Sequence, residues 1–279
     1  MIALEKGAEV IITIDDDNFA GKGNWYFEHL NSFFSSKIPV VRSKNTLINP
    51  CNILKFNYPS ARVYSRGFPL EGIFADTFEI KKSRKGKVVL NMGLWYESPD
   101  VDAFTNLIYP GLKSLGIKTK IKKYKVERGN YIPINTQNTA FLREATPACY
   151  AVLMDTQMYG VKIDRYDDIW FGFFLTKIAH RLKHDITFGT PLTLHIRNKH
   201  DYVKDFRKEL FGMIVNSRVF EIVKNCELDC VDYFDGYIQL AEKLNTEIRE
   251  KIKDSKMMKY FNKLSKAMKI WVEVVEKVM

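Results

Sequence analysis

Runs and periods of apolar residues divide the chain into a strand-rich part and a helical part. Two β-branched runs, residues 11–14 and 87–95, are typical of buried strands. A short helix over Ala3–Lys6, closed by Gly7, is predicted just before the first of them. Residues 62–65 are a candidate for a further short strand. The pattern therefore predicts a sheet that begins close to the first residue of the sequence.

The middle of the chain adds two strand regions and a long helix. Residues 119–126 alternate weakly and carry lysines, which is typical of an edge strand. Residues 186–195 are predicted to form a pair of strands broken at Gly189 and Pro191. Residues 167–182 have the wide apolar face of a helix that packs on a sheet.

A helical pattern replaces the strands after residue 200. The apolar stripes of this region, with Phe261 and Leu264 among them, are typical of a core or of an interface. We divide the chain into an α/β part, residues 1–200, and a helical C-terminal extension, residues 201–279. The predicted helices of the extension span residues 203–224, 229–253 and 256–278.

Polar residues with ligand chemistry stand where the predicted strands end. Asp15, Asp16 and Asp17 follow the first strand directly, and His195 ends the last one. Open α/β sheets bind ligands just outside the carboxyl ends of their strands. Three adjacent carboxylates favour a nearby cation, and Asp15, Asp17 and His195 would suit Mn²⁺ or Mg²⁺ with positions left for a diphosphate. The alternative is a solvated acidic turn.

Three further segments combine polar groups with special backbone positions. Asp167 and Asp168 begin a predicted helix, where the dipole keeps a carboxylate ionised, although an acidic N-cap has the same pattern. The loop from Arg66 to Gly72 contains two glycines, a proline and an arginine, as loops that approach a ligand closely often do. Asn138 lies in an apolar frame, so its amide is either satisfied internally or directed at a ligand.

Composition narrows the class of protein. The chain has 279 residues, 46% of them hydrophobic, and a net charge of +10, which indicates a globular protein with an anionic partner. Nucleotide phosphates, nucleic acid and anionic lipid would all fit. The absence of known nucleic-acid-binding signatures makes nucleic acid an unexpected partner. The lack of a P-loop and of a Gly-x-Gly-x-x-Gly motif argues against kinases and dehydrogenases.

Location and redox state follow from simpler features. The sequence shows no signal peptide and no apolar run of membrane-spanning length, so we expect a cytoplasmic protein, with peripheral membrane contact left open. The four cysteines form no zinc-binding pattern and are predicted to be buried free thiols.

The motifs, taken together and in order, resemble the reversibly glycosylated polypeptide family, which includes the UDP-arabinopyranose mutases. The similarity covers about residues 3–200, and we find none in the C-terminal helices. It rests on the following segments: Asp15-Asp16-Asp17-Asn18, Arg66-Gly67-Phe68-Pro69 with Glu71-Gly72, Gly93-Leu94-Trp95 with Pro99-Asp100-Val101-Asp102-Ala103, Asn138-Thr139-Ala140-Phe141, Arg165-Tyr166-Asp167-Asp168-Ile169-Trp170, and Pro191-Leu192 to His195.

The resemblance implies a GT-A glycosyltransferase fold, in which a Rossmann-like mixed sheet is flanked by helices. The aspartates would form a DxD-type motif, with Asp15 and Asp16 at the nucleotide and Asp15, Asp17 and His195 at the metal. The resemblance also implies that Asn138 and Arg165 contact the nucleotide-sugar. Asp167 and Asp168 would orient or deprotonate an acceptor hydroxyl. Arg66 would be the arginine that the protein glycosylates on itself. Arg66 could instead clamp a diphosphate.

Two departures from the family shape the functional hypotheses. The family begins with a strand-helix unit that supplies much of the base and ribose pocket, and we do not find it in this sequence. The Arg66 loop is also shorter than in the family. Our main prediction is a metal-dependent glycosyltransferase that uses a nucleotide-diphosphate sugar. The alternatives are a mutase that glycosylates itself at Arg66, and an inactive homologue that serves as a binding or assembly subunit, with a homo-oligomer formed through the C-terminal helices.

Overall fold

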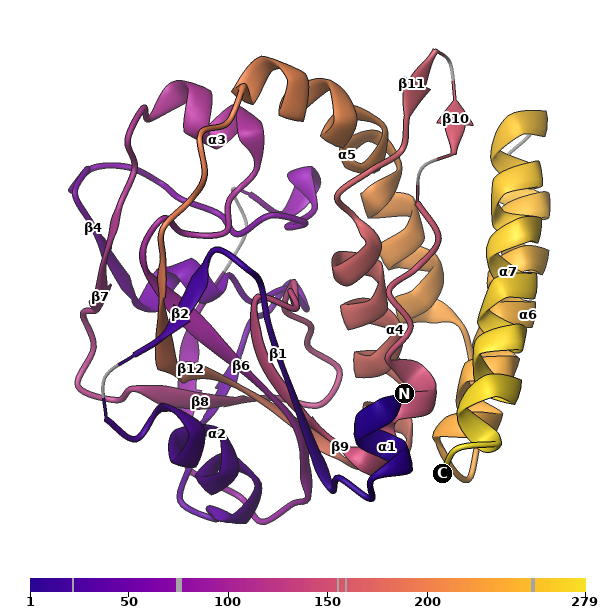
Figure 1. The fold of residues 1–279 in the computed structure, drawn as a ribbon, viewed down its shortest axis with the longest axis horizontal. Helices are drawn as coiled ribbons and strands as arrows, with labels where there is room; N and C mark the ends of the chain where they lie inside the picture. The colour runs from indigo at the N-terminus through magenta and orange to yellow at the C-terminus, as the bar shows by residue number, and fades with distance from the viewer. Residues whose placement is uncertain (22, 74–76, 155, 159, 252–253) are drawn as a thin grey trace.

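The protein is built on one mixed β-sheet, as the computed structural model in Figure 1 shows. The structure describes residues 1–21, 23–73, 77–154, 156–158, 160–251 and 254–279. Among these residues the strand order is β1-β9-β6-β12-β8-β3-β5, with β2 paired to β12, β7 paired to β6, and β4 paired to β7. The strands of this sheet are β1 (Val10–Ile14), β2 (Asn18–Ala20), β3 (Val40–Arg42), β4 (Leu54–Phe56), β5 (Glu79–Lys81), β6 (Val88–Glu97), β7 (Ser114–Ile117), β8 (Lys123–Val126), β9 (Asn138–Leu142) and β12 (Asp185–His195).

Strand direction decides where the functional residues meet. Strands β6 and β12 are parallel, β9 is antiparallel to β6, and β1 is antiparallel to β9. Strands β1, β6 and β12 therefore run the same way, and their carboxyl ends lie at one edge of the sheet. The predicted α/β class with a mixed sheet is confirmed.

Helices cover both faces of the sheet. Helix α2 packs against β6 and β12 on one face, and α4 packs against β12 on the other (Figure 1). A small hairpin of β10 (Gln157–Met158) and β11 (Val161–Lys162) precedes α4. The helices are α1 (Ile2–Glu5), α2 (Trp25–Phe34), α3 (Ala103–Ile108), α4 (Asp167–Arg181), α5 (Tyr202–Asn225), α6 (Tyr233–Lys251) and α7 (Ser255–Glu276), with 3₁₀ turns η1 (Pro50–Ile53), η2 (Leu70–Gly72) and η3 (Arg143–Ala148).

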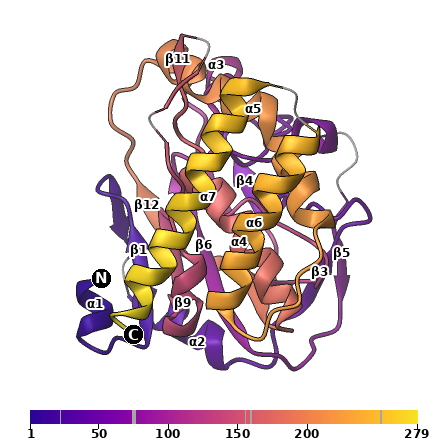
Figure 2. The same ribbon diagram turned by 90° about the vertical axis from the view of Figure 1, so that its right-hand side faces the viewer.

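The C-terminal helices belong to the same core as the sheet. Figure 2 shows α6 and α7 side by side across the α4 side of the molecule. Trp170 of α4 stacks on Phe261 of α7 with ring centroids 5.9 Å apart, and its Nε1–H donates to Asn216 of α5 over 3.0 Å. One buried cluster runs from Val41 to Val272 through both predicted parts of the chain. Most apolar residues of α6 and α7 are therefore core, and the oligomer through these helices stays a prediction.

Two predicted strands differ from the structure in their place in the sheet. The run at residues 11–14 was expected to be a buried strand, but among the described strands β1 pairs with β9 alone, and Ile14 is 43% exposed. The segment at residues 119–126 was expected at an edge, but β8 lies between β12 and β3. The lysine pattern was misleading because Lys125 is fully buried and its charge is compensated by Asp185, 3.1 Å away.

Two other strand predictions were wrong in detail. Residues 62–65 form no strand. The predicted break at Gly189 and Pro191 is only a shift of register, because β12 keeps pairing with β6 on both sides of it.

Many basic side chains of residues 81–87 and 118–125 form ion pairs or hydrogen bonds within the protein. Lys81 pairs with Glu127, Lys87 with Glu144 and Arg84 with Asp185. Lys123 donates to the Glu28 carbonyl oxygen of α2. These groups hold the sheet margin and α2 in place.

Within the described residues, no helix has the length and apolar character needed to span a membrane. The four cysteines are free, and Cys51, Cys226 and Cys230 are buried.

Candidate functional site

The acidic turn after β1 is fastened to the end of β12. The backbone N–H of Asn18 donates to the backbone carbonyl oxygen of Asp15 over 3.1 Å, which closes the turn. The Thr193 hydroxyl donates to Asn18 Oδ1 over 2.9 Å, and Asn18 pairs with His195 across β2 and β12. The two strand-end motifs predicted from the sequence are thereby brought together, with Asp17 Oδ2 3.3 Å from His195 Nε2.

The imidazole of His195 is held in one tautomer. Its Nδ1 lies 2.7 Å from the carbonyl oxygen of Ser98, which can only accept, so Nδ1 carries the hydrogen when the ring is neutral. The lone pair of Nε2 then faces the Asp17 carboxylate. Two lone pairs in this position repel each other unless a proton or a metal ion lies between them.

The Asp17–His195 pair fits a divalent cation. Ligand atoms at about 2.1 Å from a metal and at right angles to each other lie roughly 3 Å apart. The 3.3 Å separation is close to that value, and the Ser98 carbonyl provides the second contact that orients a metal-binding histidine. Over the described ranges, no group of three His, Cys, Asp or Glu residues has metal-binding geometry. Asp17 and His195 would thus leave further positions for water or for a bound diphosphate.

Asp15 adds a second carboxylate beside this pair. Burial, Asp100 and Asp17 together raise the pKa of Asp15, while Arg66 and His195 oppose the shift. The charge of Asp15 is therefore influenced both by the Asp17–His195 pair and by Arg66 with Asp100. Asp16, by contrast, is exposed, so of the three aspartates it is the one least held by the protein.

Arg66 is the centre of a buried clamp. Its guanidinium donates from Nε and Nη2 to Asp100 (2.9 and 3.2 Å) and from Nη1 and Nη2 to Asp168 (3.0 and 2.7 Å). Nη1 also donates to the Arg165 carbonyl oxygen. An arginine side chain has five N–H donors, and here each of them has an acceptor. The clamp connects the Arg66 loop, the end of β6 and the first turn of α4.

The clamp contains one more negative than positive charge. Burial raises the pKa of Asp168 to about 6, since Asp167 and Asp100 add to the effect of desolvation and only Arg66 opposes it. Arg66 lowers the pKa of Asp100 despite the burial of that carboxyl group, and Arg197 and Arg165 contribute to the same shift. Asp100 is therefore the ionised partner, and Asp168 is the one that takes up a proton first.

The other predicted residues have mixed positions. Asn138 is fully buried, and its amide group contacts His29 (2.9 Å) and donates to the carbonyl oxygens of Leu94 (3.0 Å) and Pro191 (2.9 Å). This is the internally satisfied alternative, so the Asn138 side chain does not face the acidic turn. Arg165 Nε donates to Glu209 of α5 over 2.6 Å, which ties its guanidinium to the helical part.

The acids at the start of α4 differ from each other. Both lie in the first turn of α4, as predicted. Asp168 is bound by the clamp, whereas Asp167 is only partly buried and has no side-chain hydrogen bond to any residue that the structure describes. Asp167 is therefore the acid of the pair that is free to contact a ligand.

Arg197 is a site residue that the sequence interpretation missed. Its Nη1 is buried without a hydrogen-bond partner in the described structure, and its charge reaches Asp100. Arg197 follows His195 by two residues. Because side chains two apart in an extended segment point the same way, this spacing is the signal that could have revealed it. The Arg197 guanidinium lies over the Tyr202 ring, 5.7 Å from its centroid, and a guanidinium with an unsatisfied N–H group is suited to bind an anion.

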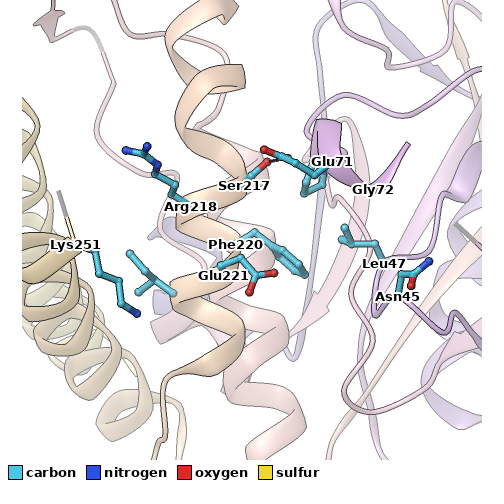
Figure 3. A pocket seen from close by; sticks show the side chains of 11 residues that line it. Asn45, Leu47, Glu71, Gly72, Ser217, Arg218, Phe220, Glu221 and Lys251 are labelled. Carbon is cyan, nitrogen blue, oxygen red and sulfur yellow. Dashed lines mark hydrogen bonds between the residues drawn. The ribbon is translucent and has the colours of Figure 1, made fainter. Parts of the chain in front are cut away.

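A separate cavity lies behind the Arg66 loop. It has a volume of about 630 Å³ and is lined by η2, α5 and the end of α6 (Figure 3). Glu71 of the loop bonds to Ser217 of α5 on its wall, and Arg218 and Lys251 lie on the opposite side from Leu47. None of the predicted site residues lines it. The loop thus has the clamp on one side and this cavity on the other.

Fold and site together define an α/β protein that gathers carboxylates, an imidazole and guanidinium groups at the carboxyl ends of three like-directed strands. The chain belongs to the reversibly glycosylated polypeptide family, whose model matches residues 51–279. The match includes the C-terminal helices, where we expected no similarity. Together with the packing of these helices on α4, it makes them part of the family's domain.

Plant proteins are similar to this chain over nearly its whole length. UDP-arabinopyranose mutase 1 of Oryza sativa subsp. japonica is 28% identical over 272 residues, which are 94% of this chain and 66% of the rice protein. UDP-arabinopyranose mutase 2 of Arabidopsis thaliana is 28% identical over 94% of this chain and 67% of its own length. A probable UDP-arabinopyranose mutase 1 of Pisum sativum is 28% identical over 96% and 68%. The chain thus spans about two thirds of the length of these relatives.

Proposed function

We propose that the protein acts on a UDP-sugar as a mutase of the UDP-arabinopyranose type, with the edge formed by β1, β6 and β12 as its active site. The observation that carries the proposal is the contact of Asp17 with His195 at this edge, with the unsatisfied Nη1 of Arg197 two residues further along the chain. Family membership and the names of the relatives support the substrate class. The metal-dependent glycosyltransferase predicted first is the second candidate, since a nucleotide-diphosphate sugar would bind the same groups.

Both reactions begin with the same bond. The bond between the anomeric carbon of the sugar and the diphosphate oxygen breaks, and negative charge develops on the leaving UDP. Arg197, whose Nη1 has no hydrogen-bond partner among the described residues, would stabilise that charge. Asp17 and His195, with Asp15 beside them, would hold a Mn²⁺ or Mg²⁺ ion, and this ion would supply further charge neutralisation.

The two reactions differ in what captures the sugar. In a mutase the sugar's own 4-hydroxyl bonds to the anomeric carbon and gives up its proton. The bond from that carbon to the old ring oxygen then breaks, this oxygen takes up a proton, and the same UDP bonds again to the anomeric carbon, so no second acceptor is needed. In a glycosyltransferase an acceptor hydroxyl attacks, and Asp167 is the carboxylate that could accept its proton. We assign to Arg66 a positioning role, because its five donors already bind Asp100, Asp168 and the Arg165 carbonyl oxygen. Self-glycosylation at Arg66 would require that clamp to open.

Incubation with UDP-arabinopyranose and Mn²⁺ separates the candidates. A mutase yields a ring isomer of the same UDP-sugar without release of UDP, and NMR of the sugar resonances distinguishes the isomers. Release of free UDP in proportion to an added acceptor would identify a transferase instead. Calorimetry with UDP, in the presence and absence of Mn²⁺, tests the site itself. A folded protein that binds no nucleotide would contradict both enzymes and favour the binding or assembly subunit.

Intact mass after incubation with the UDP-sugar tests the role of Arg66. We expect no pentose adduct on the wild-type chain. An adduct that disappears in Arg66→Lys would overturn the positioning role and support self-glycosylation. Lys120→Ala, at an exposed loop position, serves as the control for handling.

A further inference from the structure

A cavity separate from the proposed active site lies beside the pair of strands β4 and β7. It has a volume of about 490 Å³, and most of its wall comes from residues 49–64. Phe78 and Lys118, which lie outside this segment, complete the wall. We call it the β4 cavity. It contains no residue of the proposed active site and shares no lining residue with the cavity behind the Arg66 loop.

The charged residues of the β4 cavity are all basic. Lys55, Arg62 and Lys118 lie on its wall, and none of the described residues that line it is an aspartate or a glutamate. Four other cavities of the described structure each have two acidic residues on their walls. Within the described residues, no ion pair or side-chain hydrogen bond involves these three cations. A cavity with charge of one sign attracts ions of the opposite sign, so the β4 cavity is suited to an anion.

Aromatic rings form much of the apolar part of the wall. Phe56, Tyr58, Tyr64 and Phe78 line the cavity, and each is half-buried. Both tyrosine hydroxyls donate to backbone carbonyl oxygens, which leaves the rings as the contact surface for a ligand. The Phe78 ring is held edge-on by Tyr124, with ring centroids 5.3 Å apart. Rings of this kind offer a flat apolar group a large contact area.

Hydrogen bonds hold the wall in its shape. The buried Asn49 side chain donates from Nδ2 to the Val63 carbonyl oxygen over 2.8 Å, and its Oδ1 accepts from the backbone N–H of Cys51 over 3.1 Å. The backbone N–H of Lys118 donates to the Ile53 carbonyl oxygen over 2.9 Å. The segments that form the wall are therefore tied to one another, and a preorganised site loses less entropy when it binds a ligand.

We propose that the β4 cavity binds a nucleotide, with its phosphates paired to Lys55, Arg62 and Lys118 and its base packed against the aromatic rings. The volume is within the range of about 300–1,000 Å³ that is usual for small-molecule sites. A guanidinium fork and two ammonium groups are well suited to phosphate oxygens. A free phosphate ion would leave the rings without a contact, whereas the base of a nucleotide uses them.

Binding in the β4 cavity differs from binding at the proposed active site in its need for a metal. The wall supplies three positive charges itself, so the phosphates need no divalent cation to be neutralised there. The proposal concerns a second site and does not depend on the reaction assigned to the edge of β1, β6 and β12.

Calorimetry with ATP in a buffer that contains EDTA tests the proposal. EDTA removes the divalent cation on which binding at the Asp17–His195 pair would depend. We expect one ATP bound per chain, and slower hydrogen exchange within residues 49–64 when ATP is present. Tripolyphosphate, which has a similar charge but no base, should bind more weakly than ATP by about tenfold or more.

Substitution of the cations tests where the nucleotide binds. Lys55→Gln/Lys118→Gln should weaken ATP binding by about tenfold or more, and Arg62→Gln should also weaken it. The matched control Lys259→Gln/Lys266→Gln makes the same change in net charge as the first variant, at exposed positions of α7, and should leave the affinity unchanged. All five side chains are exposed, so we expect folded variants, which thermal unfolding verifies.

Four results would overturn the proposal. One is a folded wild-type chain that binds no ATP in EDTA. Another is equal affinity for ATP and tripolyphosphate, because the aromatic rings would then have no role. A third is an equal loss in the control variant, because binding would then depend on net charge alone. The last is binding that Asp17→Asn abolishes and Lys55→Gln/Lys118→Gln does not change, because ATP would then occupy the proposed active site.

Discussion

Replacing Arg66 by methionine removes the side-chain cation that contacts both Asp100 and Asp168. The charge balance of the clamp predicts the effect on stability. Arg66→Met keeps much of the length and apolar stem of the side chain but deletes all five donors. Two buried carboxyl groups then lose the guanidinium they accept from at 2.7–3.2 Å. Removing one partner of a buried ion pair costs about 3–5 kcal/mol of folding free energy, so we expect a loss in that range near neutral pH.

The loss should depend on pH with a definite sign. Without Arg66, burial raises the pKa of both carboxyl groups above the unfolded value. A group with a raised folded pKa stabilises the fold below its unfolded pKa, and that stability is lost as pH rises through the folded pKa. The variant should therefore be destabilised less at about pH 5, where protons neutralise the carboxyl groups, than at about pH 8.

Urea unfolding followed by circular dichroism at the two pH values measures both effects. The double variant Arg66→Met/Asp168→Asn should recover part of the loss at the higher pH, because it removes one uncompensated charge. Arg42→Met is the matched control, since Arg42 forms an exposed pair with Glu79 and we expect little change there. A loss below about 1 kcal/mol, or a loss equal at both pH values, would refute the clamp as the structure shows it.

Other substitutions test the site and the core. Asp17→Asn and His195→Gln should each weaken Mn²⁺-dependent UDP binding at least tenfold by calorimetry. Asp16→Asn, at an exposed position, should not weaken it. Equal effects of all three substitutions would contradict the assignment of Asp17 and His195 as metal ligands. Arg197→Met should lower UDP affinity by a similar factor without lowering the thermal midpoint, because the guanidinium Nη1 has no partner in the described structure; a loss of stability would indicate a structural role. The wild-type protein should lose stability between about pH 4 and about pH 6, because burial raises the folded pKa of Asp168 to about 6, and Asp168→Asn should remove this decline. An unchanged pH profile of the unfolding free energy would contradict the raised pKa. Phe261→Ala should cost about 3–5 kcal/mol in urea unfolding through loss of the stacking on Trp170, and a change near zero would contradict the integration of α7 into the core.

Local patterns predicted most of the elements around the site. The long helices were found because their apolar periods extend over many turns, as in α4 and the three C-terminal helices. The strands at β1, β6 and β12 and the polar residues at their ends were found from β-branched runs that stop at acid or histidine. These predictions succeeded because they depend on the properties of neighbouring residues alone.

Predictions that depend on neighbours in space were less successful. Lysines in residues 119–126 suggested an edge, but Asp185, sixty residues further along, neutralises Lys125 in the middle of the sheet. Asn138 seemed able to face a ligand, but His29 and two carbonyl oxygens occupy its amide. In both cases the partner that decides the role of the residue lies far away in the sequence.

The sequence by itself determined that this is an α/β protein with carboxylates and an imidazole at the ends of its strands, because strand periodicity and side-chain chemistry are local properties. Only the tertiary structure decided which of these groups meet. Strand direction brings Asp17 to His195, the Arg66 guanidinium joins Asp100 to Asp168, and the Nη1 of Arg197 is buried without a hydrogen-bond partner in the described structure. The physical reason is that charge pairing and desolvation act through distances of a few ångströms in space, whatever the separation along the chain.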